Sequence, residues 1–170
     1  ADAAFTLRAI KDYFHLRISD SEAKDLLAKV GSDCPFFWEN KPMFVFGRGE
    51  KMRPIDLDLS DYHVLIVNPN IHISTKEAYA GVQPSPPVID IEMLPSIEVD
   101  GWKDILVNDF ETSIFPNYPL IKEIKDELYN LGALYASMTG SGSTLFGIFK
   151  EVPEEEVFRS YMTWKGRLTF

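Results

Sequence analysis

A loop rich in glycine and hydroxyl side chains is the strongest chemical signal in this 170-residue sequence. Residues 139–144 read Thr-Gly-Ser-Gly-Ser-Thr and lie between two apolar runs. Glycine lets a ligand approach the backbone closely, and successive N–H groups of such a loop can bind a phosphate. On spacing alone, an ordinary hairpin turn explains the loop as well. The candidate substrate- and phosphate-binding residues are Gly140, Ser141, Gly142 and Ser143.

A single aspartate provides the second candidate. Asp33 lies in the segment Gly-Ser-Asp-Cys-Pro at residues 31–35, directly after a helical pattern. A carboxylate held by a rigid turn can accept the proton of a substrate hydroxyl. The alternative is an aspartate that only hydrogen-bonds its own turn, which is the commoner role of Asp in such segments.

Other polar and aromatic residues carry weaker signals. The run Asn-Asp-Phe-Glu at residues 108–111 could line a cleft, although helix capping explains it equally well. Tyr79 could stack on a nucleobase, while packing is the usual role of a lone aromatic. We expect no metal bound by protein side chains, because the histidines are far apart and lack ligand spacing. They are His15, His63 and His72.

Composition excludes several functional classes. A net charge of −9 argues against binding to a nucleic-acid backbone, which requires many Lys and Arg side chains, but it allows a small phosphorylated ligand. Cys34 is the only cysteine, so no internal disulfide forms and a reducing cytoplasm is expected. The sequence contains neither an apolar run of membrane-spanning length nor a secretion-signal pattern.

The elements that must position these residues follow from periodicity and punctuation. A helix over residues 19–30 is the best marked, because Ser19 and Glu22 can form a capping box and Gly31 is typical of a helix end. Pro119 and Gly132 delimit a second amphipathic helix. Further helices are expected over residues 1–14, near 74–75 and over 153–162. Strands are expected over residues 36–38, 43–46, 63–67, 133–138, 145–149 and 168–170, with another short strand that ends at residue 52. Residues 82–96 are expected to form a surface loop.

Helices alternate with adjacent strand pairs along the chain, without repeats. This order predicts an α+β fold, in which helices pack on one face of a mostly antiparallel sheet.

Taken in order, four segments resemble the GHMP kinases, the family of galactokinase, homoserine kinase and mevalonate kinase. They are similar to the family segments G-[AS]-D-[VC]-P-F-F, G-x-G-E, N-D-[LF]-E and M-[TS]-G-S-G-[SA]-[TC]. The likeness is strongest to the branch that phosphorylates a cytidyl-bearing alcohol of non-mevalonate isoprenoid synthesis. The matching segments here are residues 31–37, 47–50, 108–111 and 138–144.

The resemblance implies a role for each candidate. Asp33 would be the catalytic carboxylate that takes or orients the proton of a substrate hydroxyl, and the Gly/Ser loop would lie near substrate and phosphates. Tyr79 would stack on the cytosine ring. ATP would be the phosphoryl donor, with Mg²⁺ carried on the nucleotide and a small molecule as the substrate. The fold would be a ferredoxin-like C-terminal domain over residues 61–170, preceded over residues 1–60 by a remnant of the N-terminal domain.

The same resemblance predicts an incomplete enzyme. Ala1-Asp2-Ala3-Ala4 is similar to the last residues of the family's ATP-phosphate loop, so we expect this chain to be a C-terminal portion that is inactive alone. Two alternatives stay open, another small-molecule kinase of the family and a non-catalytic ferredoxin-like module that binds a metabolite.

Overall fold

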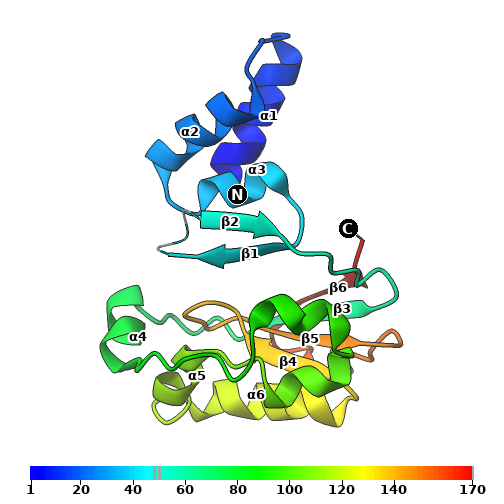
Figure 1. Ribbon diagram of the computed structural model, residues 1–170. Coiled ribbons are helices and arrows are strands. Elements are labelled where there is room, and N and C mark those ends of the chain that lie inside the picture. Colours follow the sequence, from blue (N-terminus) through cyan, green and yellow to red (C-terminus); the bar gives the residue numbers. More distant parts are fainter. Residues whose placement is uncertain (48, 50, 170) are drawn as a thin grey trace. The chain divides into compact units, whose positions relative to one another are not determined.

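The computed structural model describes residues 1–47, 49 and 51–169. It contains two compact units, Ala1–Leu57 and Asp58–Phe170 (Figure 1). Each unit has a hydrophobic core of its own. The assignment of residues 1–60 to the remnant of an N-terminal kinase domain stays a prediction.

The first unit consists of three helices and a two-stranded ribbon. The helices are α1 (Asp2–Tyr13), α2 (Asp20–Val30) and α3 (Cys34–Glu39). They enclose a small core because each contributes apolar side chains at helical spacing. The buried members of this core are Ala4, Ala23, Leu27 and Trp38.

The predicted helix over residues 19–30 is confirmed together with its capping box. Ser19 Oγ accepts a hydrogen bond from the Glu22 N–H at 3.3 Å, and Glu22 Oε2 accepts one from the Ser19 N–H at 2.9 Å. The latter bond lowers the pKa of Glu22 because it stabilises the carboxylate. Gly31 ends the helix as predicted, in an extended conformation with φ −179°.

The strand predicted over residues 36–38 is wrong, because these residues belong to α3. Pro35 occupies the first turn of this helix, where its missing N–H is not needed. Trp38 is buried in the core of the unit. A helical turn brings Trp38 into that core, and this packing outweighs the β-propensity of the aromatic run.

The first strand of the two-stranded ribbon lies where it was predicted. Strand β1 (Met43–Phe46) pairs antiparallel with β2 (Lys51–Pro54), and Val45 lies opposite Met52. The bend between them includes Gly47 and Gly49, whereas Arg48 and Glu50 of the G-x-G-E segment lie outside the described residues.

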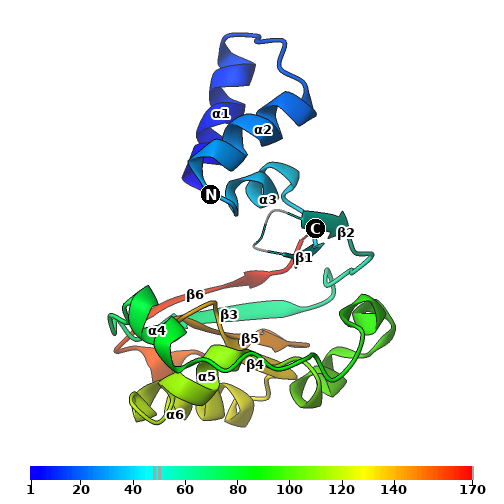
Figure 2. The same cartoon turned by 60° about the vertical axis from the view of Figure 1, so that its left-hand side comes forward.

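The second unit is built on a four-stranded antiparallel sheet. Its strands are β3 (His63–Asn68), β4 (Tyr135–Met138), β5 (Leu145–Phe149) and β6 (Met162–Arg167), in the spatial order β4-β5-β3-β6. Figures 1 and 2 show β3 and β5 in the middle of the sheet. Numbered along the chain, this order is 2-3-1-4, the arrangement of a ferredoxin-like fold. The predicted α+β class with an antiparallel sheet is confirmed.

Helices cover one face of this sheet. They are α4 (Thr75–Gly81), α5 (Asp109–Ile114) and α6 (Pro119–Asn130), and Figure 2 shows α6 running along the sheet. The 3₁₀ helices η1 (Ile91–Ser96) and η2 (Val99–Asp104) lie between α4 and α5 in sequence. The apolar stripe of α6 packs on the inward side chains of the strands. The central members of this core are Leu65, Val67, Ile121, Ile124, Leu128, Ala136 and Leu145.

The predicted last helix over residues 153–162 is wrong. Only a short 3₁₀ helix, η3 (Glu156–Phe158), forms there, and the chain then enters β6. Strand β6 pairs along the whole of β3, so it satisfies backbone groups of a strand that would otherwise end the sheet. The expected closing strand is wrong for residues 168–169, because β6 already ends at Arg167, and Phe170 lies outside the described residues.

Among the residues that the structure describes, no helix has the length and apolar character needed to span a membrane.

Candidate functional site

Asp33 lies at the start of α3 in the first unit, with an exposed side chain. Its Oδ1 accepts a hydrogen bond from Ser32 Oγ at 2.9 Å. Among the described residues, no backbone N–H of α3 is capped by this carboxylate. The carboxylate is therefore accessible to a ligand while one of its oxygens is oriented by the preceding serine.

A glycine of the following bend lies directly against Asp33. Gly49 has a φ of +103°, and a Cβ at this position would lie 2.7 Å from Asp33 Oδ1. The same Cβ would lie 3.8 Å from the Ser32 side chain. The bend between β1 and β2 thus leaves room for the carboxylate because residue 49 carries no side chain.

The Gly/Ser loop joins β4 to β5 in the second unit. The Thr139 N–H donates to the Thr144 carbonyl at 2.8 Å, and the Gly142 N–H donates to the Thr139 carbonyl at 3.0 Å. Gly140 and Gly142 have φ values of 55° and 85°, a left-handed conformation that glycine adopts without strain. The chain therefore reverses within four residues, as the hairpin interpretation required.

The loop nevertheless offers donors to a ligand. Within the described part of the chain, the backbone N–H groups of Gly140, Ser141 and Ser143 have no hydrogen-bond partner. Ser143 is buried, and its Oγ donates to the Ile71 carbonyl at 2.6 Å. The far end of the loop is thus anchored, while the exposed Gly140 and the half-buried Ser141 retain free N–H groups of the kind that binds an anion.

The segment before α5 contacts the near end of the loop. Asn108 Nδ2 donates to the Met138 carbonyl at 2.8 Å and to the Gly140 carbonyl at 2.9 Å. Glu111 Oε1 accepts a hydrogen bond from the Met138 N–H at 2.8 Å. Two segments about 30 residues apart are therefore joined at the point where β4 becomes the loop.

Tyr79 projects from α4 with 63% of its surface exposed. Its ring meets that of Phe110 edge to face, with centroids 5.0 Å apart and an interplanar angle of 81°. Helices α4 and α5 pack closely here, because a Cβ at Gly81 would lie 2.7 Å from the Ser113 Cβ. Tyr79 is thus an exposed aromatic face supported from behind by α5.

A second contact, from Tyr118 to Glu77, also holds helix α4, which carries Tyr79. Tyr118 Oη donates to Glu77 Oε1 at 2.8 Å, and this bond raises the pKa of Tyr118 because the proton bridges to a carboxylate.

The structure therefore gathers the second-unit candidates around α5. Asn108 contacts the loop that contains Gly140, and Phe110 contacts Tyr79. Asp33 belongs to the other unit, where its neighbours are Ser32 and Gly49.

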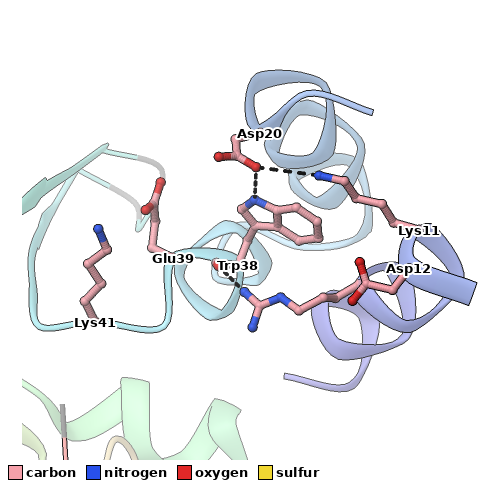
Figure 3. A pocket seen from close by; sticks show the side chains of 7 residues that line it. Lys11, Asp12, Asp20, Trp38, Glu39 and Lys41 are labelled. Atoms are coloured by element: carbon pink, nitrogen blue, oxygen red, sulfur yellow. Dashed lines mark hydrogen bonds and ion pairs between the residues drawn. The ribbon is translucent and has the colours of Figure 1, made fainter. Parts of the chain in front are cut away.

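A polar pocket of the first unit is lined by side chains of which several contact one another (Figure 3). Trp38 Nε1 donates to Asp20 Oδ1 at 3.3 Å, and Lys11 Nζ lies 3.9 Å from the same oxygen. The Arg8 guanidinium lies 5.3 Å from the Trp38 ring centroid and donates to the Trp38 carbonyl. These side chains satisfy one another and join α1, α2 and α3. The residues that line this pocket do not include Asp33.

No metal-binding cluster emerges from the described residues, since no group of three His, Cys, Asp or Glu side chains gathers there.

Sequence reasoning did not assign Asn108 and Glu111 to the site. Their segment was interpreted as a helix cap or a cleft lining and as one of the family-like segments, without a role for either residue. Asn108 does cap α5 by accepting from the Phe110 N–H at 3.0 Å. The hydrogen bonds from the Asn108 amide to the Gly/Ser loop region could not be predicted, because a side-chain contact across 30 residues leaves no local sequence pattern.

The chain is similar to proteins named as kinases. Residues 93–163 match the family model described as GHMP kinases C terminal. A protein of Parabacteroides distasonis named 4-diphosphocytidyl-2-C-methyl-D-erythritol kinase is 42% identical over 99% of this chain and 64% of its own length. A protein of Azobacteroides pseudotrichonymphae with the same name is 49% identical over 89% of this chain and 57% of its own length. The chain thus spans less than two thirds of these relatives.

Solved structures share the fold. A crystal structure of 4-(cytidine 5'-diphospho)-2C-methyl-D-erythritol kinase superposes with a TM-score of 0.77 and 24% identity, over 97% of this chain and 62% of that one. The homoserine kinase of Cytophaga hutchinsonii gives a TM-score of 0.60 with 14% identity, over 94% of this chain and 61% of that one.

Proposed function

The chain contains a GHMP kinase C-terminal domain, and from this premise we propose that it is part of an ATP-dependent kinase. The substrate we propose is 4-diphosphocytidyl-2-C-methyl-D-erythritol, phosphorylated on its 2-hydroxyl in the synthesis of isoprenoid precursors. The observation that carries this proposal is the identity of 42% along 99% of the chain with a protein named for that activity.

Asp33 is the proposed acceptor of the hydroxyl proton. Its carboxylate is exposed and oriented by Ser32, so it can take a hydrogen bond from a substrate alcohol. Taking that proton increases the nucleophilicity of the oxygen as it attacks phosphorus. Phosphoryl transfer depends mainly on positioning and charge stabilisation, so one oriented carboxylate is an adequate contribution from this segment.

The Gly/Ser loop is the proposed anion-binding element. The available N–H groups of Gly140, Ser141 and Ser143 fit the oxygens of a phosphate chain, because they are held in place before the ligand arrives. Gly142 completes the loop with its left-handed conformation. ATP, with Mg²⁺ carried on its phosphates, would supply the phosphoryl group.

Tyr79 is the proposed platform for the cytosine ring. It exposes one aromatic face while Phe110 supports the ring edge to face. A base stacked on such a ring gains roughly 1–3 kcal/mol. We also propose a cytoplasmic location, which the single, unpaired Cys34 supports.

A kinase assay on the full-length gene product that carries this chain tests the proposal. We expect ATP-dependent formation of the 2-phosphate of the cytidyl alcohol, with little turnover of homoserine or of a mevalonate-type alcohol. Preferential turnover of a control alcohol would assign the chain to another kinase of the family. Binding of the cytidyl compound without any turnover would support the non-catalytic module instead.

A further inference from the structure

Both polar atoms of the Asn108 side-chain amide are hydrogen-bonded, one to α5 and the other to the backbone at the near end of the Gly/Ser loop. Its Nδ2 donates to the Met138 and Gly140 carbonyls, and its Oδ1 accepts from the Phe110 N–H. An asparagine amide has two N–H donors and one oxygen acceptor, so each polar atom of this side chain has found a partner. The acceptor serves α5, while both donors serve the Gly/Ser loop.

The two carbonyls that Asn108 binds flank Thr139, the first residue of the loop. Glu111, three residues after Asn108, holds the preceding strand, since its Oε1 accepts from the Met138 N–H and from Ser137 Oγ at 3.2 Å. The Met138 peptide groups are thus bound on both their N–H and carbonyl sides by side chains of one short segment.

The opposite end of the loop is held by Ser143 and by packing around Gly142. Ser143 Oγ binds the Ile71 carbonyl, and a Cβ at Gly142 would lie 2.6 Å from Met138 Sδ and 3.2 Å from Ile73 Cδ1. With both ends fixed, the conformation of the free N–H groups between them depends on Asn108 at one side and on these contacts at the other.

We propose that Asn108 is a positioning residue for the phosphate-binding loop, and that Glu111 supports it by fixing the end of β4. The two Nδ2 hydrogen bonds turn the Met138 and Gly140 carbonyls toward Asn108. The intervening backbone therefore presents its N–H groups to a ligand in one conformation, which lowers the reorganisation needed when the reaction develops charge. This inference rests on the proposed kinase function.

A capping role alone does not account for these contacts. A cap needs only an oxygen acceptor, and Asp, Ser or Thr provides it as well as Asn does. The two donors that reach the loop require an amide. Asn108→Asp therefore keeps the cap on α5 and removes the contacts to the loop, which separates the two roles.

Asn117→Asp is a matched control. Asn117 is exposed in the same unit, and its Nδ2 donates to the Ser113 carbonyl at 3.2 Å. The control makes the same chemical change and adds the same charge without touching the loop.

The experiment measures two properties of the full-length protein for the wild type and both variants. Hydrogen–deuterium exchange of peptides covering residues 138–144 reports the order of the loop, and steady-state kinetics with ATP and the cytidyl alcohol report function. We expect Asn108→Asp to exchange at least ~10-fold faster in this region. We also expect kcat to fall by roughly 10- to 100-fold, the cost of a misplaced catalytic element. Asn117→Asp should match the wild type in both.

The outcomes separate this inference from the proposed function. Unchanged loop exchange in Asn108→Asp overturns the positioning role, whatever happens to kcat. Faster exchange with wild-type kcat overturns it as well, because the loop order would then have no bearing on the reaction. If the wild type phosphorylates none of the tested alcohols, the kinase proposal fails, and the exchange data still decide whether Asn108 orders the loop.

Discussion

Lys125 Nζ lies 2.5 Å from Glu111 Oε2 and joins α6 to α5 directly behind the end of β4. The side chain of Glu111 is only 8% exposed and that of Lys125 21%. The other carboxylate oxygen of Glu111 holds the Met138 N–H. This ion pair is therefore shielded from solvent and connected through Glu111 to Met138, the last residue of β4 before the Gly/Ser loop.

Loss of Lys125 should destabilise the second unit. Lys125→Met keeps most of the aliphatic stem but leaves Glu111 without its cation, so we expect the free energy of unfolding to fall by roughly 2–4 kcal/mol. Lys122→Met is the control, since Lys122 forms an exposed pair with Asp126 in the same helix and should cost less than about 0.5 kcal/mol. Urea denaturation measures both, and equal effects would contradict the importance assigned to burial.

Asp33→Asn should lower kcat on the order of 10²- to 10⁴-fold in the full-length enzyme, because an amide cannot accept the hydroxyl proton. The thermal stability should change little, since the Asp33 side chain is exposed. Asp25→Asn, at another exposed position of the same unit, controls for the loss of charge. Near-wild-type turnover of Asp33→Asn would remove this residue from the catalytic role.

Gly49→Ala should impair turnover through Asp33. The new Cβ would lie 2.7 Å from Asp33 Oδ1, so the carboxylate must move, and we expect kcat to fall by roughly 10- to 100-fold. Gly132→Ala is a matched control, because Gly132 has a similar φ of +92° with no described heavy atom within 4 Å of the added Cβ. Both variants carry backbone strain, so a kinetic defect shared by the two would refute a specific effect on Asp33.

Tyr79→Ala should raise the KM for the cytidyl alcohol by roughly 5- to 100-fold, the equivalent of losing one base–aromatic stack. Its kcat at saturating substrate should remain close to that of the wild type, because Tyr79 is assigned to binding only. Tyr79→Phe retains the ring and should retain the KM. An unchanged KM in Tyr79→Ala would exclude the stacking role.

Tyr135 should make the second unit sensitive to alkaline pH. Burial raises the pKa of this phenol from 10.0 to about 12. Between these values the unfolded chain loses the proton while the folded state keeps it. The contribution to stability is therefore complete below pH 10 and disappears as the pH rises toward 12.

Tyr135→Phe should flatten that decline. The variant loses the hydrogen bond from Tyr135 Oη to the Leu106 carbonyl, which costs about 1 kcal/mol near neutral pH. Above pH 10 it should lose stability less steeply than the wild type in denaturation curves taken at several pH values. Tyr13→Phe, which removes a phenol that is 80% exposed, is the control. A wild-type slope in Tyr135→Phe would show that other groups cause the alkaline loss.

Local signals in the sequence were enough to predict several elements. Ser19 with Glu22, and Pro119 with Gly132, mark helix ends by chemistry that acts within a few residues, and the structure confirms both helices. Three of the four strands of the larger sheet, predicted over residues 63–67, 133–138 and 145–149, were equally readable, so the α+β class followed.

Elements that depend on distant partners were mispredicted. Residues 36–38 carry β-forming side chains, yet they are helical because the helix buries Trp38 in the core of the first unit. Met162 begins a strand only because β3 offers an unpaired edge, which no pattern near residue 162 reveals. Asn108 was missed for the same reason, since its partners Met138 and Gly140 are distant in sequence.

The position of β3 in the sheet has a consequence for synthesis on the ribosome. This strand pairs on one side with β5 and on the other with β6, so its neighbours begin only at Leu145 and Met162. The α-helices of the first unit have local contacts and can form as soon as they emerge. The apolar β3 stays unpaired until these two strands have been translated, and long-range pairing of this kind is slow and prone to aggregation. Within this chain, the nascent second unit is therefore more prone to aggregation than the helices of the first unit.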